Sequence, residues 1–124
     1  MLNIFNIALG GAIGAVMRYL VSTGVHSLLG RGFPYGTMTV NVLGSFLIGF
    51  MYVFLMERSS LGPEWRALIL IGFLGAFTTF STFSLETLNL LQSGAMARAM
   101  ANILISVITC ILATWLGIIL GRQL

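Results

Sequence analysis

The chain has 124 residues, of which 58% are hydrophobic and only 7% charged, and six arginines against three glutamates give a net charge of +3. Soluble domains carry about 25% charged residues, so this composition excludes a soluble protein and indicates a membrane protein. The arginines are scattered along the chain, which excludes the clustered basic surface of a nucleic-acid-binding protein.

Four apolar segments take up nearly all of the chain and predict transmembrane helices at about residues 4–26, 36–56, 65–92 and 97–121. We expect residues 1–124 to form a single all-α domain. The third segment is the exception in length, because a continuous helix of that size would extend for about 42 Å. The hydrocarbon core is about 30 Å thick. The segment therefore tilts strongly or is broken, and Gly75 to Thr79 is the natural place for a break.

The arginines at the two ends of the predicted bundle are nearly balanced. Four spans place both termini on one side, with Arg58, Arg66 and Arg122, and leave Arg31 and Arg98 on the other. Orientation follows such differences in short loops, so a weak bias or insertion in both directions fits this sequence. We favour dual topology. Four helices enclose little space, and an antiparallel homodimer would supply the inverted halves typical of transporters.

Two glycine pairs, Gly10 with Gly14 and Gly117 with Gly121, occur at the spacing that lets helices approach closely. Such pairs are common in membrane helices. We expect them to serve ordinary packing within one bundle.

Small and polar residues form stripes on the second and fourth segments, because spacings of three and four place side chains on one helix face. Asn41 offers amide donors at membrane depth, either to a pathway or to a neighbouring helix. The hydroxyls of the fourth segment can instead bond to their own helix backbone. The stripes consist of Thr37, Asn41, Gly44, Ser45 and Ile48, and of Asn102, Ser106, Thr109 and Ala113.

The segment 72–83 combines glycines, hydroxyls and phenylalanines with no charge between Arg66 and Glu86. Lipid penalises unpaired polar groups, so such a segment should line a cavity, a pore or a protein surface. Phe80 and Phe83 share a helix face beside Ser81 and Thr82. Phenyl rings have a positive edge. Although aromatic residues at this spacing are often core residues, these rings and hydroxyls together would suit an anion without holding it too tightly for conduction.

A break near Gly75 and Thr78 would free backbone carbonyls, and carbonyls of interrupted membrane helices commonly coordinate Na⁺. If Gly75 and Thr78 of two antiparallel chains met on a two-fold axis, four carbonyls would converge on one cation. Water or hydroxyl groups would satisfy the same carbonyls in the simpler alternative.

Two ionisable residues, Arg18 and Glu86, lie within predicted membrane helices, where charges are functional candidates by default. Arg18 either extends to the interface or lines an aqueous vestibule that attracts anions, and we favour the vestibule. Glu86 would repel an anion, so we expect it near a wet entrance or in a hydrogen bond.

Three stretches resemble the Fluc (CrcB-type) fluoride channel family: residues 10–19 (GGAIGAVMRY), 36–46 (GTMTVNVLGSF) and 72–84 (GFLGAFTTFSTFS). The resemblance covers essentially the whole chain, and the third stretch is highly specific. It implies an antiparallel, dual-topology homodimer with two fluoride pathways and a structural Na⁺ at the interface.

The resemblance also implies roles for individual residues. Phe80 and Phe83 match the phenylalanine box of the family and Asn41 its pore asparagine, whereas Gly75 and Thr78 match the positions whose carbonyls hold Na⁺. The remaining matches are residues near the route: Ser81, Thr82, Arg18, Ser106 and Thr109. With Thr37 and Glu86 they complete the predicted fluoride pathway.

We therefore expect a channel that lets fluoride leave the cytoplasm of a bacterium through its inner membrane, with fluoride, Na⁺ and lipid as partners. A small multidrug exporter is the nearest rival, but it needs a carboxylate in the first helix, which has none. A non-transporting assembly subunit is a further alternative. An enzyme is not expected, because His26 is the sole histidine and has no partner constellation.

Overall fold

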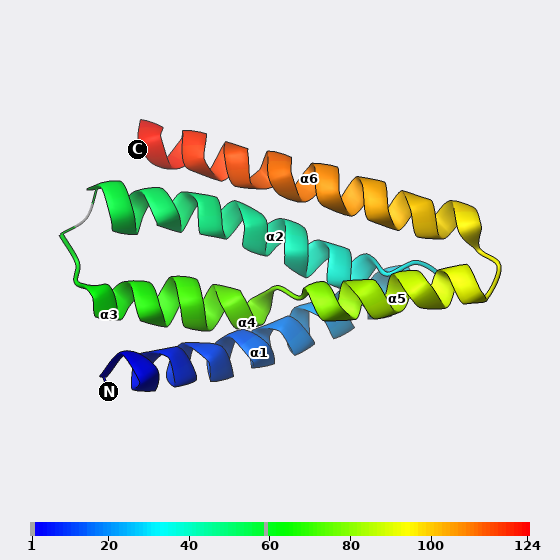
Figure 1. Ribbon diagram of the computed structural model, residues 1–124, viewed down its shortest axis with the longest axis horizontal. Coiled ribbons are helices and arrows are strands. Elements are labelled where there is room, and N and C mark those ends of the chain that lie inside the picture. The colour runs from blue at the N-terminus through cyan, green and yellow to red at the C-terminus, as the bar shows by residue number, and fades with distance from the viewer. Residues whose placement is uncertain (1, 59) are drawn as a thin grey trace.

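The computed structural model describes residues 2–58 and 60–124, and these residues fold into helices joined by short loops (Figure 1). Four helical segments are long and apolar enough to cross a membrane: Asn3–Leu29, Tyr35–Arg58, Pro63–Gln92 and Met96–Gln123. Both chain ends lie at the same end of the molecule, as four crossings require (Figure 1). The prediction of an all-helical protein with four membrane-spanning segments is confirmed.

The first and last spans are single helices, α1 (Leu2–Leu29) and α6 (Met96–Gln123). The second span begins as α2 (Tyr35–Tyr52) and continues as a π-helical turn, η1 (Val53–Arg58). The third span has four parts, which are α3 (Pro63–Arg66), the π-helical η2 (Ala67–Leu74), α4 (Gly75–Phe77) and α5 (Phe80–Gln92). The π-helical turns were not predicted.

The first helix extends three residues beyond its predicted end, to Leu29, and its termination explains why. Gly30 has a φ of +86° and donates its N–H to His26 O at 2.8 Å. A left-handed glycine that follows the last helical residue is a common C-terminal cap, because glycine has no Cβ to clash in that conformation. The helix therefore ends at the glycine rather than at Ser27, where the loop was predicted to begin.

Glycines bring the spans into two tight pairs, α1 with η2 and α2 with α6. A Cβ on Gly10 would collide with Leu68 O, and one on Gly14 with Phe73 O. In the second pair, a Cβ on Gly117 would collide with Phe46 O. Both predicted glycine pairs thus pack within one chain. Because lipid offers no hydrophobic drive for helix association, such close backbone contact is a main source of stability.

Replacing Gly14 with alanine should destabilise the protein by about 1–3 kcal/mol, the usual cost of overpacking a fixed contact. Gly24→Ala is the matched control, since a Cβ there meets open space on the same helix. We expect that variant to be neutral or slightly more stable, because alanine is the better helix former. Thermal unfolding in detergent, followed by circular dichroism, measures both. Equal stability of the two variants would contradict the close α1–η2 contact.

Candidate functional site

The third span contains two residues with extended backbone between α4 and α5. Thr78 has φ −87° and ψ 160°, and Thr79 has φ −153° and ψ 122°. Thr78 still donates both its N–H and its hydroxyl to Leu74 O, at 3.2 and 3.0 Å. The Leu74 carbonyl is therefore satisfied, and the change in backbone direction begins at Thr78, after the last residue of α4.

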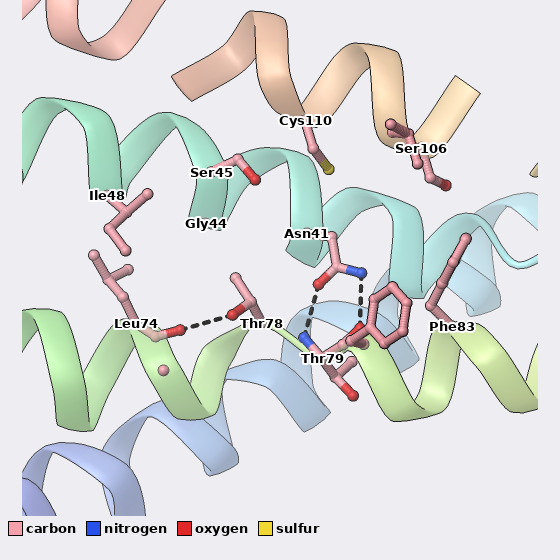
Figure 2. A pocket seen from close by; sticks show the side chains of 13 residues that line it. Asn41, Gly44, Ser45, Ile48, Leu74, Thr78, Thr79, Phe83, Ser106 and Cys110 are labelled. Carbon is pink, nitrogen blue, oxygen red and sulfur yellow. Dashed lines mark hydrogen bonds between the residues drawn. The ribbon is translucent and has the colours of Figure 1, made fainter. Parts of the chain in front are cut away.

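The side chain of Asn41 on α2 holds the backbone of Thr79 with two hydrogen bonds. Asn41 Nδ2 donates to Thr79 O at 2.9 Å, and Thr79 N–H donates to Asn41 Oδ1 at 2.8 Å, as Figure 2 shows. In a continuous α-helix the same N–H would bond to Gly75 O. The asparagine thus replaces a helical partner and leaves the Gly75 carbonyl without its usual donor.

The hydroxyl of Thr79 caps the helix that follows. Its Oγ1 accepts the N–H of Thr82 at 3.2 Å and lies 3.1 Å from Thr82 Oγ1, to which it donates. Threonine at this position satisfies one of the unpaired N–H groups at a helix start. Thr79 is only 9% exposed. Its backbone bonds to Asn41 and its side chain caps α5, so both stabilise the junction between α4 and α5.

A pocket of about 340 Å³, here called the phenylalanine pocket, lies between α2, the third span and α6 (Figure 2). The rings of Phe80 and Phe83 lie on its wall with their centroids 5.5 Å apart, tilted by 45°. Phe80 is 77% exposed, so the pocket is open on this side. No charged residue lines it, and its members are Asn41, Gly44, Ser45, Ile48, Leu74, Gly75, Thr78, Thr79, Phe80, Phe83, Ser106, Val107 and Cys110.

A second pocket of about 240 Å³, here called the arginine pocket, lies between α1, α2 and the start of α5. It contains Arg18, the one charged residue in its lining, together with several hydroxyl groups. Thr79 lines both pockets and so lies at their boundary. The other members are Ala15, Tyr19, Ser22, Thr23, Thr37, Val40 and Thr82.

The structure divides the predicted site residues among three places. Gly75, Thr78 and four of the predicted pathway residues line the phenylalanine pocket, whereas Arg18, Thr37 and Thr82 line the arginine pocket. Ser81, Thr109 and Glu86 line neither. The four pathway residues in the phenylalanine pocket are Asn41, Phe80, Phe83 and Ser106.

The three residues outside the pockets have different surroundings. Thr109 donates to Ile105 O in its own helix, which is the alternative that the sequence left open for it. Ser81 is exposed, with its hydroxyl 3.5 Å from that of Thr79. Oε1 of Glu86 is buried without a hydrogen-bond partner in the part of the chain that the structure describes. The expected hydrogen bond is therefore not made by that oxygen.

Asn41 differs from expectation in one respect. The sequence suggested two free amide donors, but one is given to Thr79 O, which leaves one N–H for another partner. Sequence reasoning also missed Thr79 as part of the site, and Thr87, which lines neither pocket but accepts a hydrogen bond from Asn102 on α6. Thr79 could have been found from its place at the break, three residues before Thr82 as a helix cap requires. Thr87 follows Phe83 by four residues and so shares its face.

The described residues contain no group of three or more histidine, cysteine, aspartate or glutamate side chains that could hold a metal ion. A cation at this site would have to be held by backbone carbonyls or hydroxyls. The Gly75 carbonyl, deprived of its helical donor by Asn41, fits that requirement.

Replacing Asn41 with leucine should remove both bonds to Thr79 and leave two backbone groups unpaired, at a cost of about 2 kcal/mol. Hydrogen exchange at the Thr79 amide should be faster in this variant, because the amide loses its acceptor. Thr39→Val is the matched control, because Thr39 lies on the same helix and its hydroxyl donates to Tyr35 O, within that helix. Unchanged exchange at Thr79 in the Asn41 variant would show that the junction does not depend on this side chain.

Comparison with known proteins places the chain in a family. The model of the family described as CrcB-like protein, Camphor Resistance (CrcB), matches residues 5–118. A relative from Magnetococcus marinus named fluoride-specific ion channel FluC is 54% identical, over 94% of both chains. One of the same name from Geobacter metallireducens is 51% identical over the full length of both.

A third relative, from Methylococcus capsulatus, has the same name and is 54% identical over 99% of this chain. The chain spans about half of its length, 54%. Four apolar helices and these full-length matches identify a multi-pass membrane protein. The chain belongs to the CrcB-like family.

Proposed function

We propose that this protein is a fluoride-selective channel that lets fluoride leave a bacterial cytoplasm passively through the inner membrane and so relieves its toxicity. The names of the full-length relatives support this assignment, since each is called a fluoride-specific ion channel. They also confirm that the chain is not an enzyme. The rival reading as a small multidrug exporter is weakened, because no carboxylate lies in α1.

The observation that carries the proposal is the phenylalanine pocket, which combines polar groups and phenyl rings at membrane depth without a charged side chain. Fluoride is small and strongly hydrated, so an ion entering hydrocarbon must exchange water for other donors. The remaining N–H of Asn41 is such a donor, and the hydroxyl of Ser106 becomes one when it turns away from Asn102. The edges of Phe80 and Phe83 add a weakly positive rim. Neutral groups bind an anion weakly enough to release it.

The arginine pocket supplies the approach to this site. Arg18 attracts anions into a polar recess, and Thr37 and Thr82 offer hydroxyls along it. Thr79 joins the two pockets, so the route passes the Asn41–Thr79 pair. Ser81, Thr109 and Glu86 line neither pocket. We propose that they lie at the margins of the route and would contact it only when a second chain of the dimer is present.

The functional unit in this proposal is an antiparallel homodimer with two fluoride pathways. The phenylalanine pocket of one chain is open, and Phe80 is largely exposed on it. A second copy inserted in the opposite direction would close this side and complete each pathway. The balance between Arg58, Arg66 and Arg122 at one end and Arg31 and Arg98 at the other supports dual insertion.

A structural Na⁺ at the dimer axis completes the proposal. Thr79 N–H is given to Asn41, which frees the Gly75 carbonyl, and the extended backbone at Thr78 turns its own carbonyl out of the helical pattern. Carbonyls released by a broken membrane helix commonly coordinate Na⁺. Two such carbonyls from each chain would make a four-oxygen site that cross-links the subunits.

Replacing Phe80 or Phe83 with isoleucine should abolish fluoride efflux from reconstituted liposomes, because isoleucine fills the space but has no positive ring edge. A fluoride electrode measures the efflux. Phe54→Ile on η1 is the matched control, since Phe54 is exposed and lines neither pocket, and it should keep the wild-type rate.

Chloride efflux from the same liposomes tests selectivity, and we expect none. Wild-type fluoride flux in both pocket variants would exclude a role for the rings, and absence of fluoride flux in the wild type would exclude the channel. Replacing Na⁺ by a large organic cation throughout preparation should lower the flux of the wild type, as loss of a subunit cross-link predicts.

Dual topology predicts that about half of the molecules expose one end of the bundle outside the cell and the other half expose the opposite end. Single cysteines at Ser60 and Ser93, each in a Cys110→Ala background, mark the two ends, which lie far apart in Figure 1. An impermeant maleimide applied to intact cells should label about half of each variant. Full labelling of one variant and none of the other would establish a single orientation.

A further inference from the structure

A directed chain of hydrogen bonds runs through the contact between α5 and α6 and ends at the phenylalanine pocket. Ser106 Oγ donates to Asn102 Oδ1 at 3.2 Å, Asn102 Nδ2 donates to Thr87 Oγ1 at 2.9 Å, and Thr87 donates to Phe83 O at 2.8 Å. Asn102 is 1% exposed, and Thr87 and Ser106 are 7% and 5% exposed. Of the three side chains, only Ser106 lines the pocket.

The direction of this chain is fixed at its far end. A threonine hydroxyl has a single proton, and Thr87 gives it to the carbonyl of Phe83. Thr87 can therefore only accept from Asn102, which turns the NH₂ group of the amide toward α5. The amide oxygen must then face Ser106, and it receives the single hydroxyl proton of that serine.

This arrangement decides what Ser106 offers to the pocket. With its proton given to Asn102, Ser106 presents oxygen lone pairs, which repel an anion. To bind fluoride, the hydroxyl must rotate and leave Asn102 Oδ1 buried without a donor. Such a buried unpaired acceptor is costly. The amide therefore opposes tight binding of fluoride at Ser106.

We propose that Asn102, which lines neither pocket, is a positioning residue that sets the hydroxyl direction of Ser106 and so weakens fluoride binding in the phenylalanine pocket. The proposal rests on the fluoride-channel function proposed above. It assigns to α5 and α6 a task beyond packing: Thr87 orients the Asn102 amide, and the amide keeps the site in the weak-binding range that conduction needs.

Asn102→Leu tests the proposal in reconstituted liposomes, because leucine has a similar volume and no acceptor. The freed hydroxyl of Ser106 should lower the half-saturating fluoride concentration of the flux by about tenfold, which corresponds to about 1.4 kcal/mol. Thr87→Val should act in the same direction, since the Asn102 amide can then turn its NH₂ group toward Ser106. This second variant keeps the test usable if Asn102→Leu does not fold.

Two controls separate positioning from a general structural effect. Ser106→Ala combined with Asn102→Leu should have the same half-saturation as Ser106→Ala alone, because the effect acts through the serine. Thr39→Val removes a hydroxyl that lines neither pocket, so this variant should keep the wild-type half-saturating concentration.

An unchanged or higher half-saturating concentration in a folded, conducting Asn102→Leu or Thr87→Val variant would overturn this inference but leave the proposed function standing. So would an equal shift of the half-saturating concentration with and without Ser106. A wild-type protein that releases no fluoride would instead overturn the proposed function, and this inference with it.

Discussion

The two hydrogen bonds between Asn41 and Thr79 are the interaction on which the site depends. A membrane helix cannot leave backbone groups unpaired in lipid, where each costs several kcal/mol, so an interruption needs partners from within the protein. Asn41 supplies a donor and an acceptor at once, from the two separate atoms of its amide group. The Gly75 carbonyl thereby loses its helical donor, and α5 begins at Phe80 directly after the junction.

The glycine contacts set the position of this junction. α1 approaches η2 through Gly10 and Gly14, and α2 approaches α6 through Gly49 and Gly117, closely enough to exclude a Cβ. These contacts fix α2 and the third span, which carry Asn41 and Thr79. The polar groups can therefore be few and uncharged, since the backbone packing rather than ion pairs supplies rigidity. The one ion pair described, between Arg122 and Glu57, lies exposed at the chain-end side of the bundle.

Much of this architecture could be predicted from the sequence, because hydropathy determines spans in a protein with so few charges. The four spans and both glycine pairs follow from local patterns. The pairing of Asn41 with Thr79 does not, because 38 residues separate them. The π-helical turns η1 and η2 could not be predicted either, because the spacing of apolar residues in these segments does not distinguish a π-helix from an α-helix. Two hydrogen bonds were also beyond prediction: Asn41 donates to Thr79 O, and Ser106 donates to Asn102 Oδ1. Both depend on side-chain geometry, which residue types alone leave open.

The two asparagines illustrate opposite uses of the same amide. Asn41, at the wall of the phenylalanine pocket, satisfies the backbone with one donor and leaves a second N–H for the ion in the proposed pathway. Asn102, almost fully buried, has its oxygen occupied by the one hydroxyl that faces the pocket from α6. A site built only from free donors would hold fluoride strongly and release it slowly. A donor already engaged elsewhere lowers the affinity without introducing a negative charge, which would exclude the ion altogether. In this way hydrogen-bond competition, rather than charge, can adjust an anion pathway in a membrane.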